Sequence, residues 1–261
     1  MQDKQINIED KVVDWLSKEG YRLEYIVHKA FSDIGLTTVM SNHFETSEGK
    51  WREIDVTAVQ MPKGELAKSI AVRVMCECKY SADNPWVLLQ SDVQSNLWCD
   101  WISLPQSPSV KELSRDIENY ATHLYRSWHF AKGQLFAHNL VQAFREKNRD
   151  MAFDSLQKIS NAAWDYVETP FRRGHSAYLI AIPALIVEAP IYSAWFDHRN
   201  SKFVVKEIKY GRLSWSGCRG GTAVDVVHTS AINDYASAIR LTFEILLYIL
   251  ADLLSKSNQD T

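Results

Sequence analysis

Glycine and proline are scarce in this chain of 261 residues, which contains 10 glycines and 7 prolines. No Gly/Ser-rich or Pro-rich linker, no low-complexity segment and no internal repeat divides the sequence. Hydrophobic residues make up 46% of the chain, enough to fill a core, so disorder is not expected. We therefore expect a single domain over residues 1–261, with a division near Thr169 and Pro170 left open as an alternative.

Cysteine is scarce as well, and the four residues of this type are Cys76, Cys78, Cys99 and Cys218. They form no C-x-x-C pair and no Cys/His grouping with zinc spacing, so reduced thiols in a cytoplasmic protein fit best. The first residues lack the apolar run of a secretory signal. The most apolar stretch, 241–254, is interrupted by Glu244 and Asp252 and is too short in apolar residues for a membrane span, so we expect a buried terminal helix.

An excess of positive charge is also missing, because 29 Lys and Arg stand against 32 Asp and Glu. Any binding of nucleic acid must then depend on a local patch. The segment 170–175, with Arg172 and Arg173, is the best candidate for a phosphate contact, and a solvated loop is an equally open interpretation. His123, His129 and His138 could face a phosphate too, although surface or core-edge positions are more usual for such histidines.

The spacing of apolar residues predicts an α/β fold. Two helices are expected to end at Gly20 and Gly35, followed by three strands joined by hairpins. A helical insertion is expected at about 110–167, and strands then return before a terminal helix. The expected strands are 36–44, 53–60, 71–80, 177–189, 191–196, 203–213 and 224–228, and the terminal helix is 231–255.

Two of the first three strands carry charges on one face. Side chains alternate across a strand, so Glu77 and Lys79 point to the same face, and pairing of the two strands as a hairpin allows Asp55 to face Glu77. An E-x-K pattern alone is most often a surface salt bridge of little energy. Here apolar residues flank the charges, as in a buried strand, where an unpaired charge is costly. This context favours a functional site.

Two neighbouring carboxylates repel each other unless a cation lies between them, and oxygen ligands of this kind suit Mg²⁺ or Mn²⁺. A metal ion held in this way can activate a water molecule and neutralise charge on a phosphate, while the lysine orients the water or stabilises the transition state. The residue types therefore predict phosphodiester hydrolysis with Asp55, Glu77 and Lys79 as catalytic residues.

Asp55, the interval of about twenty residues and Glu77-Cys78-Lys79 resemble the PD-(D/E)xK nuclease superfamily, the restriction-endonuclease-like proteins. The resemblance covers roughly residues 20–90. It implies a core of one helix, a three-stranded hairpin sheet, a second helix and a further strand. One visible difference is Ile54, which stands where the family pattern has proline before the aspartate.

The resemblance also implies the metal ligands. These would be the carboxylates of Asp55 and Glu77 and the main-chain carbonyl of Cys78, with Glu24 on the first helix as a further ligand. For Glu24, a solvated helix position beside His28 is an equally open interpretation. Residues 77–81 and 85–87 are similar to the motif region of bacterial members associated with restriction or defence.

The expected function is therefore that of a metal-dependent endonuclease hydrolysing phosphodiester bonds in DNA, in restriction or phage defence. RNA stays open as the substrate. Cutting both strands of a duplex with one site per chain would favour a homodimer. The alternative is a catalytically inactive protein of the same fold that serves as a nucleic-acid-binding or assembly module, which the acidic net charge favours.

Overall fold

A computed structural model describes residues 7–18, 20–46, 49–64, 69–80, 84–94, 96–130, 135–144, 150–175, 177–215 and 221–257. The helices are α1 (Ile8–Lys18), α2 (Tyr21–Asp33), α3 (Leu97–Ile102), α4 (Pro108–Leu113), α5 (Ala121–Leu124), α6 (Met151–Arg172) and α7 (Ile232–Ser257), with 3-10 turns η2 (Ser114–Tyr120), η3 (Trp128–Phe130) and η4 (Thr229–Ala231). The strands are β1 (Thr37–Glu45), β2 (Trp51–Gln60), β3 (Ile70–Tyr80), β4 (Trp86–Gln94), β5 (Leu135–Gln142), β6 (Tyr178–Glu188), β7 (Ile191–Asp197), β8 (Lys202–Ile208), β9 (Tyr210–Trp215) and β10 (Thr222–His228).

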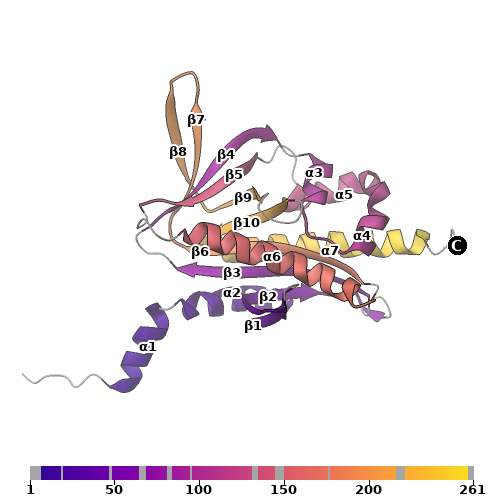
Figure 1. Cartoon of the computed structure of the whole chain (residues 1–261), viewed down its shortest axis with the longest axis horizontal. Helices are drawn as coiled ribbons and strands as arrows, with labels where there is room; N and C mark the ends of the chain where they lie inside the picture. The colour runs from indigo at the N-terminus through magenta and orange to yellow at the C-terminus, as the bar shows by residue number, and fades with distance from the viewer. Residues whose placement is uncertain are drawn as a thin grey trace, which may run out of the picture.

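All ten strands form one mixed sheet in the order β1-β2-β3-β6-β10-β9-β5-β4-β7-β8 (Figure 1). Strands β1, β2 and β3 are antiparallel neighbours, as the hairpin pattern predicts. Strand β6 follows helix α6 and pairs in parallel with β3 along the full length of both strands. Strands from both sides of residue 170 therefore alternate within the same sheet.

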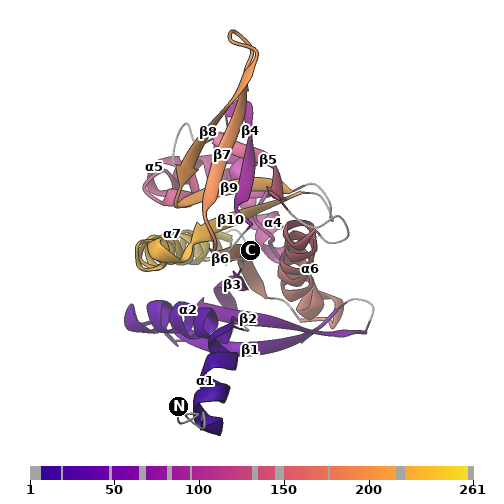
Figure 2. The ribbon, with the colours of Figure 1, turned by 90° about the vertical axis from the view of Figure 1, so that its left-hand side faces the viewer.

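The helices cover the two faces of the sheet separately. Helices α2 and α7 lie on one face, and α6 lies on the other (Figure 2). Buried residues of the 97–130 segment join the cluster of α2 and α7. Each face has its own cluster of fully buried apolar side chains, and such burial contributes about 25 cal/mol per Å² of apolar surface. Among the described residues no helix is long and apolar enough to cross a membrane.

The first two helices match the expected pattern. Helix α1 ends at Lys18 and helix α2 at Asp33, and Gly20 and Gly35 follow them with φ of 87° and 82°. Only glycine adopts such angles without steric cost, so these two residues let the chain turn out of one element and into the next.

Three expectations about the middle and the end of the chain are wrong. The segment 110–167 is not continuously helical, because β5 lies between the short helices and α6, and β4 precedes them. The single strand expected at 203–213 is two strands, β8 and β9, which bend apart at Lys209 and lie far from each other in the sheet order. The segment 170–172 is the last part of α6 and not a loop.

Candidate active site

Strands β2 and β3 bring Asp55 and Glu77 to the same end of the sheet. Their antiparallel register pairs Val56 with Cys76. Asp55 precedes Val56 on β2 and Glu77 follows Cys76 on β3, so both acids lie just beyond this pair. Asp55 Oδ2 accepts a hydrogen bond of 2.7 Å from the backbone N–H of Cys78. This bond fixes the aspartate against β3 and leaves Oδ1 for another partner.

A lysine from helix α6 joins the two carboxylates. Lys158 Nζ lies 2.6 Å from Glu77 Oε2 and 3.6 Å from Asp55 Oδ1. Lys79 Nζ donates to the other oxygen of Glu77, at 2.5 Å. Two acids and two lysines therefore form one compact cluster, which we call the Asp55–Glu77 cluster. The three residues expected from the sequence are close together, and Lys158 is an addition.

Burial sets the electrostatics of this cluster. The side chain of Glu77 is 1% exposed, and burial and then repulsion from Asp55 raise its pKa, against the attraction of Lys79 and Lys158. Burial lowers the pKa of Lys158, but attraction to Glu77 and Asp55 outweighs it, so the net shift is upward. Lys158 is thus held as a cation by the acids that it contacts.

Glu24 lies on helix α2 and is half-buried. Burial, followed by repulsion from Asp55, Glu53 and Glu77, raises its pKa to about 7, while Lys79 opposes this shift. The carboxylates of the cluster therefore act electrostatically on Glu24. Glu53, near the start of β2, is exposed.

The cluster is accessible from solvent at its edges. The side chains of Lys158 and Lys79, whose ammonium groups contact the buried glutamate, are 33% and 25% exposed. A hollow lies further along α6, between that helix and the β1–β2 hairpin, and is lined by His43, Phe44, Trp51, Tyr166, Thr169 and Arg173, among others.

The donor set fits a small hard cation with few protein ligands. Glu77 Oε2 is buried and makes no hydrogen bond of acceptable geometry within the described residues, although Lys158 lies close to it. Asp55 and Glu77 already share one positive charge, and Mg²⁺ is commonly held by one or two carboxylates and several waters. Among the described residues no group of three or more His, Cys, Asp or Glu could hold a metal ion, so Glu24 does not complete a set of three carboxylates.

The other cations considered as phosphate contacts have acidic partners. Arg173 lies 2.8 Å from Glu45, and Arg172 pairs with Glu168. His138 on β5 is exposed, and His123 contacts the ring of Tyr248. The positive charges of Arg172 and Arg173 are therefore compensated by neighbouring glutamates.

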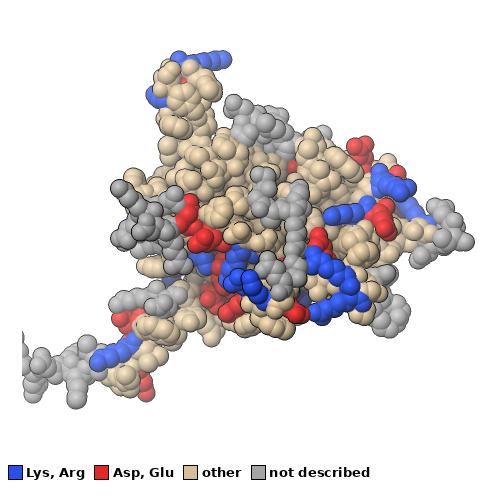
Figure 3. Space-filling model, viewed as in Figure 1, with Lys and Arg blue, Asp and Glu red and all other residues tan. Residues whose placement is uncertain are grey.

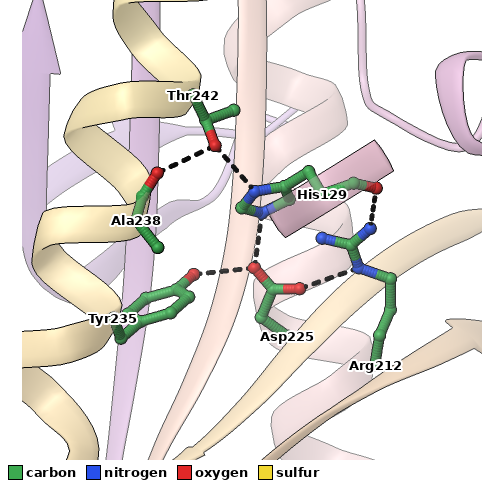
Figure 4. A network of polar contacts seen from close by, with 6 residues as sticks. All are labelled: His129, Arg212, Asp225, Tyr235, Ala238 and Thr242. Carbon is green, nitrogen blue, oxygen red and sulfur yellow. Dashed lines mark hydrogen bonds and ion pairs between the residues drawn. The ribbon is translucent and has the colours of Figure 1, made fainter. Parts of the chain in front are cut away.

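His129 lies in a buried polar network (Figure 4). Its Nε2 is 2.6 Å from Asp225 Oδ2 and its Nδ1 is 3.2 Å from Thr242 Oγ1, while Arg212 and Tyr235 also bind Asp225. The hydroxyl of Thr242 is fully buried and bonds the carbonyl of Ala238, so it is not a nucleophile available to substrate. The network connects η3, in the segment between β3 and α6, to β9, β10 and α7, and its role is structural.

The charges of this network balance if His129 is neutral. Burial and Arg212 together lower the pKa of His129 below 6.5, although Asp225 opposes the shift. Burial raises the pKa of Asp225, but His129 and Arg212 outweigh it and hold the value at about 2. Arg212 and Asp225 form a buried ion pair, and Nε2–H of His129 donates a further hydrogen bond to Asp225.

Comparison of the chain with protein-family models, with curated proteins and with solved structures finds no match. The molecule is an α/β protein with a ten-stranded mixed sheet flanked by helices. What it does is inferred below from the cluster and its surroundings.

Proposed function

We propose that this protein is a Mg²⁺- or Mn²⁺-dependent nuclease of the restriction-endonuclease-like class that hydrolyses phosphodiester bonds in DNA. The observation that carries the proposal is the convergence of Asp55 and Glu77 on one ammonium group, with Lys79 in contact with the same glutamate. Two carboxylates that already share one cation supply the oxygen ligands and the negative charge that suit a divalent ion. A role in restriction or phage defence belongs to the same proposal.

The order of elements supports this class. Helix α2, the antiparallel strands β1, β2 and β3, helix α6 and the parallel strand β6 occur in the order implied for the PD-(D/E)xK core. Strands β4 and β5 and the short helices are inserted between β3 and α6. The acids lie on the second and third strands, where the resemblance expects them.

Each residue of the cluster then has a task. When bound, the metal ion would activate a coordinated water and neutralise charge on the scissile phosphate. Asp55 keeps its orientation because Cys78 N–H holds Oδ2. Lys79 orients the water or stabilises negative charge on the phosphate. Lys158 leaves the space between the acids and presents its ammonium group to the substrate.

A second candidate function is a non-catalytic binding or assembly module. The observation in its favour is Lys158 itself, since its ammonium fills the place of the metal and compensates the acids without one. The absence of a third acid in the described cluster points the same way. Metal binding distinguishes the two functions, because a module stabilised by Lys158 has no need of a divalent ion.

The decisive experiment compares cleavage of plasmid and linear DNA by the wild type and by Asp55→Asn, Glu77→Gln and Lys79→Met. We expect the wild type to cut with Mg²⁺ or Mn²⁺ and not in EDTA, and each variant to lose about 100-fold or more of the rate. Asp33→Asn is the matched control, because this exposed acid on α2 pairs with Lys29 away from the cluster.

Calorimetric titration with Mn²⁺ gives the second readout. The wild type should bind the ion, and Asp55→Asn should bind it more weakly by a factor of ten or more, roughly the loss seen at metal sites. A wild type that neither binds Mn²⁺ nor cuts DNA would support the non-catalytic module. Cleavage that persists in all three variants would contradict the assignment of the site.

A further inference from the structure

Strands β7 and β8 form an arm that projects from the body of the protein (Figures 1 and 2). Strand β4 pairs with β7 only from Ile191 to Ala194, so among the described strands the outer part, 195–204, pairs only within its own hairpin. Asp197 accepts hydrogen bonds from the N–H groups of Arg199 and Asn200 and closes the turn at the tip. The arm is an ordered two-stranded ribbon.

Large apolar side chains on this arm are exposed to solvent. Phe203 is 66% and Val205 57% exposed, and Phe196 contacts the ring of Phe203 at 5.3 Å. An isolated two-stranded ribbon is at best marginally stable in water, and exposed apolar groups of this kind mark interaction surfaces. The arm therefore has the character of a binding element.

The arm carries exposed cations, and one of them, Lys202, lies opposite Asp197 in the strand register without forming an ion pair. Arg199, Lys202 and Lys206 are exposed, and their side chains make no ion pair with any described residue. Lys202 and Lys206 lie on one face of β8, since side chains two and four residues apart share a face. Lys29 on α2, by contrast, is paired with Asp33. Positive side chains are visible at the outer end of the arm in Figure 3.

The base of the arm lies next to the candidate active site. Tyr80, the residue after Lys79, pairs with Glu188 at the end of β6, and β7 begins three residues later. The arm thus rises from the same end of the sheet as the Asp55–Glu77 cluster. A polymer bound along the arm would pass this end of the sheet.

From these observations we propose that the β7–β8 arm inserts into the major groove of duplex DNA, an inference that rests on the proposed nuclease function for the identity of the polymer. The major groove of B-form DNA, about 12 Å wide, admits a two-stranded ribbon, whose strands are about 4.8 Å apart. Lys202 and Lys206 contact phosphates at its edge. The major groove of double-stranded RNA is too narrow for a ribbon, so the arm selects DNA.

A second copy of the chain is the competing occupant. Strand β8 is the edge of the sheet and could pair with another edge strand. Lysines on an edge strand discourage this pairing, because they would bring like charges together and would have to be buried. The unpaired cations therefore favour a polyanion over a second copy of the chain.

The test measures the affinity for a 25-base-pair DNA duplex in EDTA over a range of salt concentrations. We expect Lys202→Ala/Lys206→Ala to weaken binding about tenfold and to reduce the slope of log K against log salt by about 2, since each phosphate contact contributes about 0.9. Lys11→Ala/Lys63→Ala, at exposed positions on α1 and after β2, is the control with the same change in net charge. Circular dichroism checks that the arm variant is folded.

The outcomes separate the arm from the active site. DNA binding that depends on the arm, without Asp55-dependent cleavage, would support the inference and contradict the proposed nuclease function. Asp55-dependent cleavage with unchanged affinity and salt slope in the arm variant would overturn the inference alone. Equal, arm-dependent binding of double-stranded RNA would also overturn it, as would loss of self-association in the arm variant with DNA binding intact.

Discussion

At the scale of single residues, Lys158 has the largest influence on the candidate site. It contacts both carboxylates and is the group that a divalent ion would displace. Its partner Glu77 is almost fully buried, so the loss of a neighbouring cation leaves a charge that solvent cannot compensate. The stability of the metal-free protein should therefore depend on this lysine.

We expect Lys158→Ala to lower the free energy of unfolding without metal by about 1–3 kcal/mol, less than the 3–5 kcal/mol of a fully buried pair because Lys158 is partly exposed. Mg²⁺ should stabilise this variant more than the wild type, because the ion no longer competes with the lysine. Urea denaturation with and without 10 mM Mg²⁺ measures both effects, and Lys158→Arg is the control that keeps the charge. Equal stabilisation of the alanine variant and the wild type by Mg²⁺ would show that the ion and the lysine do not compete.

The sequence predicts part of the cluster and not all of it. Asp55, Glu77 and Lys79 can be related to each other because strand alternation and a hairpin place neighbouring residues on one face. Lys158 comes from a helix 79 residues beyond Lys79, and nothing in helical periodicity says which strand that helix covers. Its neighbours Leu156 and Ile159 show the buried stripe of α6, but a lysine beside such a stripe looks like any solvated residue.

At the scale of elements, His129 connects the insertion to the sheet and to α7. It is carried by η3, whereas Asp225, Arg212 and Tyr235 come from β10, β9 and α7. Asp225 stays ionised down to about pH 2, whereas burial lowers the pKa of His129 below its ordinary value. Docking of the insertion should thus depend on the protonation of one side chain.

We expect the free energy of unfolding to fall as the pH is lowered below about 6.5. The pKa of His129 is lowered in the folded protein, so the unfolded chain binds the proton first and acid favours unfolding. Its contribution to stability is fully present above pH 6.5 and is lost progressively below it. Urea midpoints between pH 5 and pH 8 should show this dependence, and the difference from His129→Gln isolates it from the other histidines. A variant with the same pH slope as the wild type would contradict the assignment.

The sequence predicts well those helices and strands in which apolar residues recur at a regular spacing. The two N-terminal helices, the first three strands and the terminal helix match their expected ranges closely. Strands β4 and β5 were not expected, because they lie among helical segments and β5 carries polar residues such as His138 and Asn139. Their place in the sheet depends on long-range pairing, which local periodicity does not report.

At the scale of the whole molecule, the sheet combines both halves of the chain. The pattern predicts an α/β protein with a mixed sheet, but the order of the ten strands depends on contacts between distant segments. Strand β6 lies between β3 and β10, and its fully buried residues, such as Ile182 and Ala184, complete the core. The two halves should therefore not be independent.

A fragment that ends at residue 170 is expected not to fold cooperatively. It would leave β3 without its parallel neighbour and would expose the apolar surface that β6 and α7 cover. Urea denaturation followed by circular dichroism should give no sigmoidal transition for the fragment and one for the full chain, and coexpression with residues 171–261 should restore it. A cooperative transition of the fragment alone would instead indicate a domain boundary near Thr169.

The position of β6 has a consequence for biosynthesis. At 5–20 residues per second, a ribosome makes β6 roughly 5–20 s after β3. Throughout this interval β3 of the nascent chain has one unpaired edge, the kind of edge on which aggregation begins and which chaperones protect. Translation must pass residue 188 before Glu77 has its permanent surroundings, so any cutting of nucleic acid has to wait until that part of the polypeptide has been made.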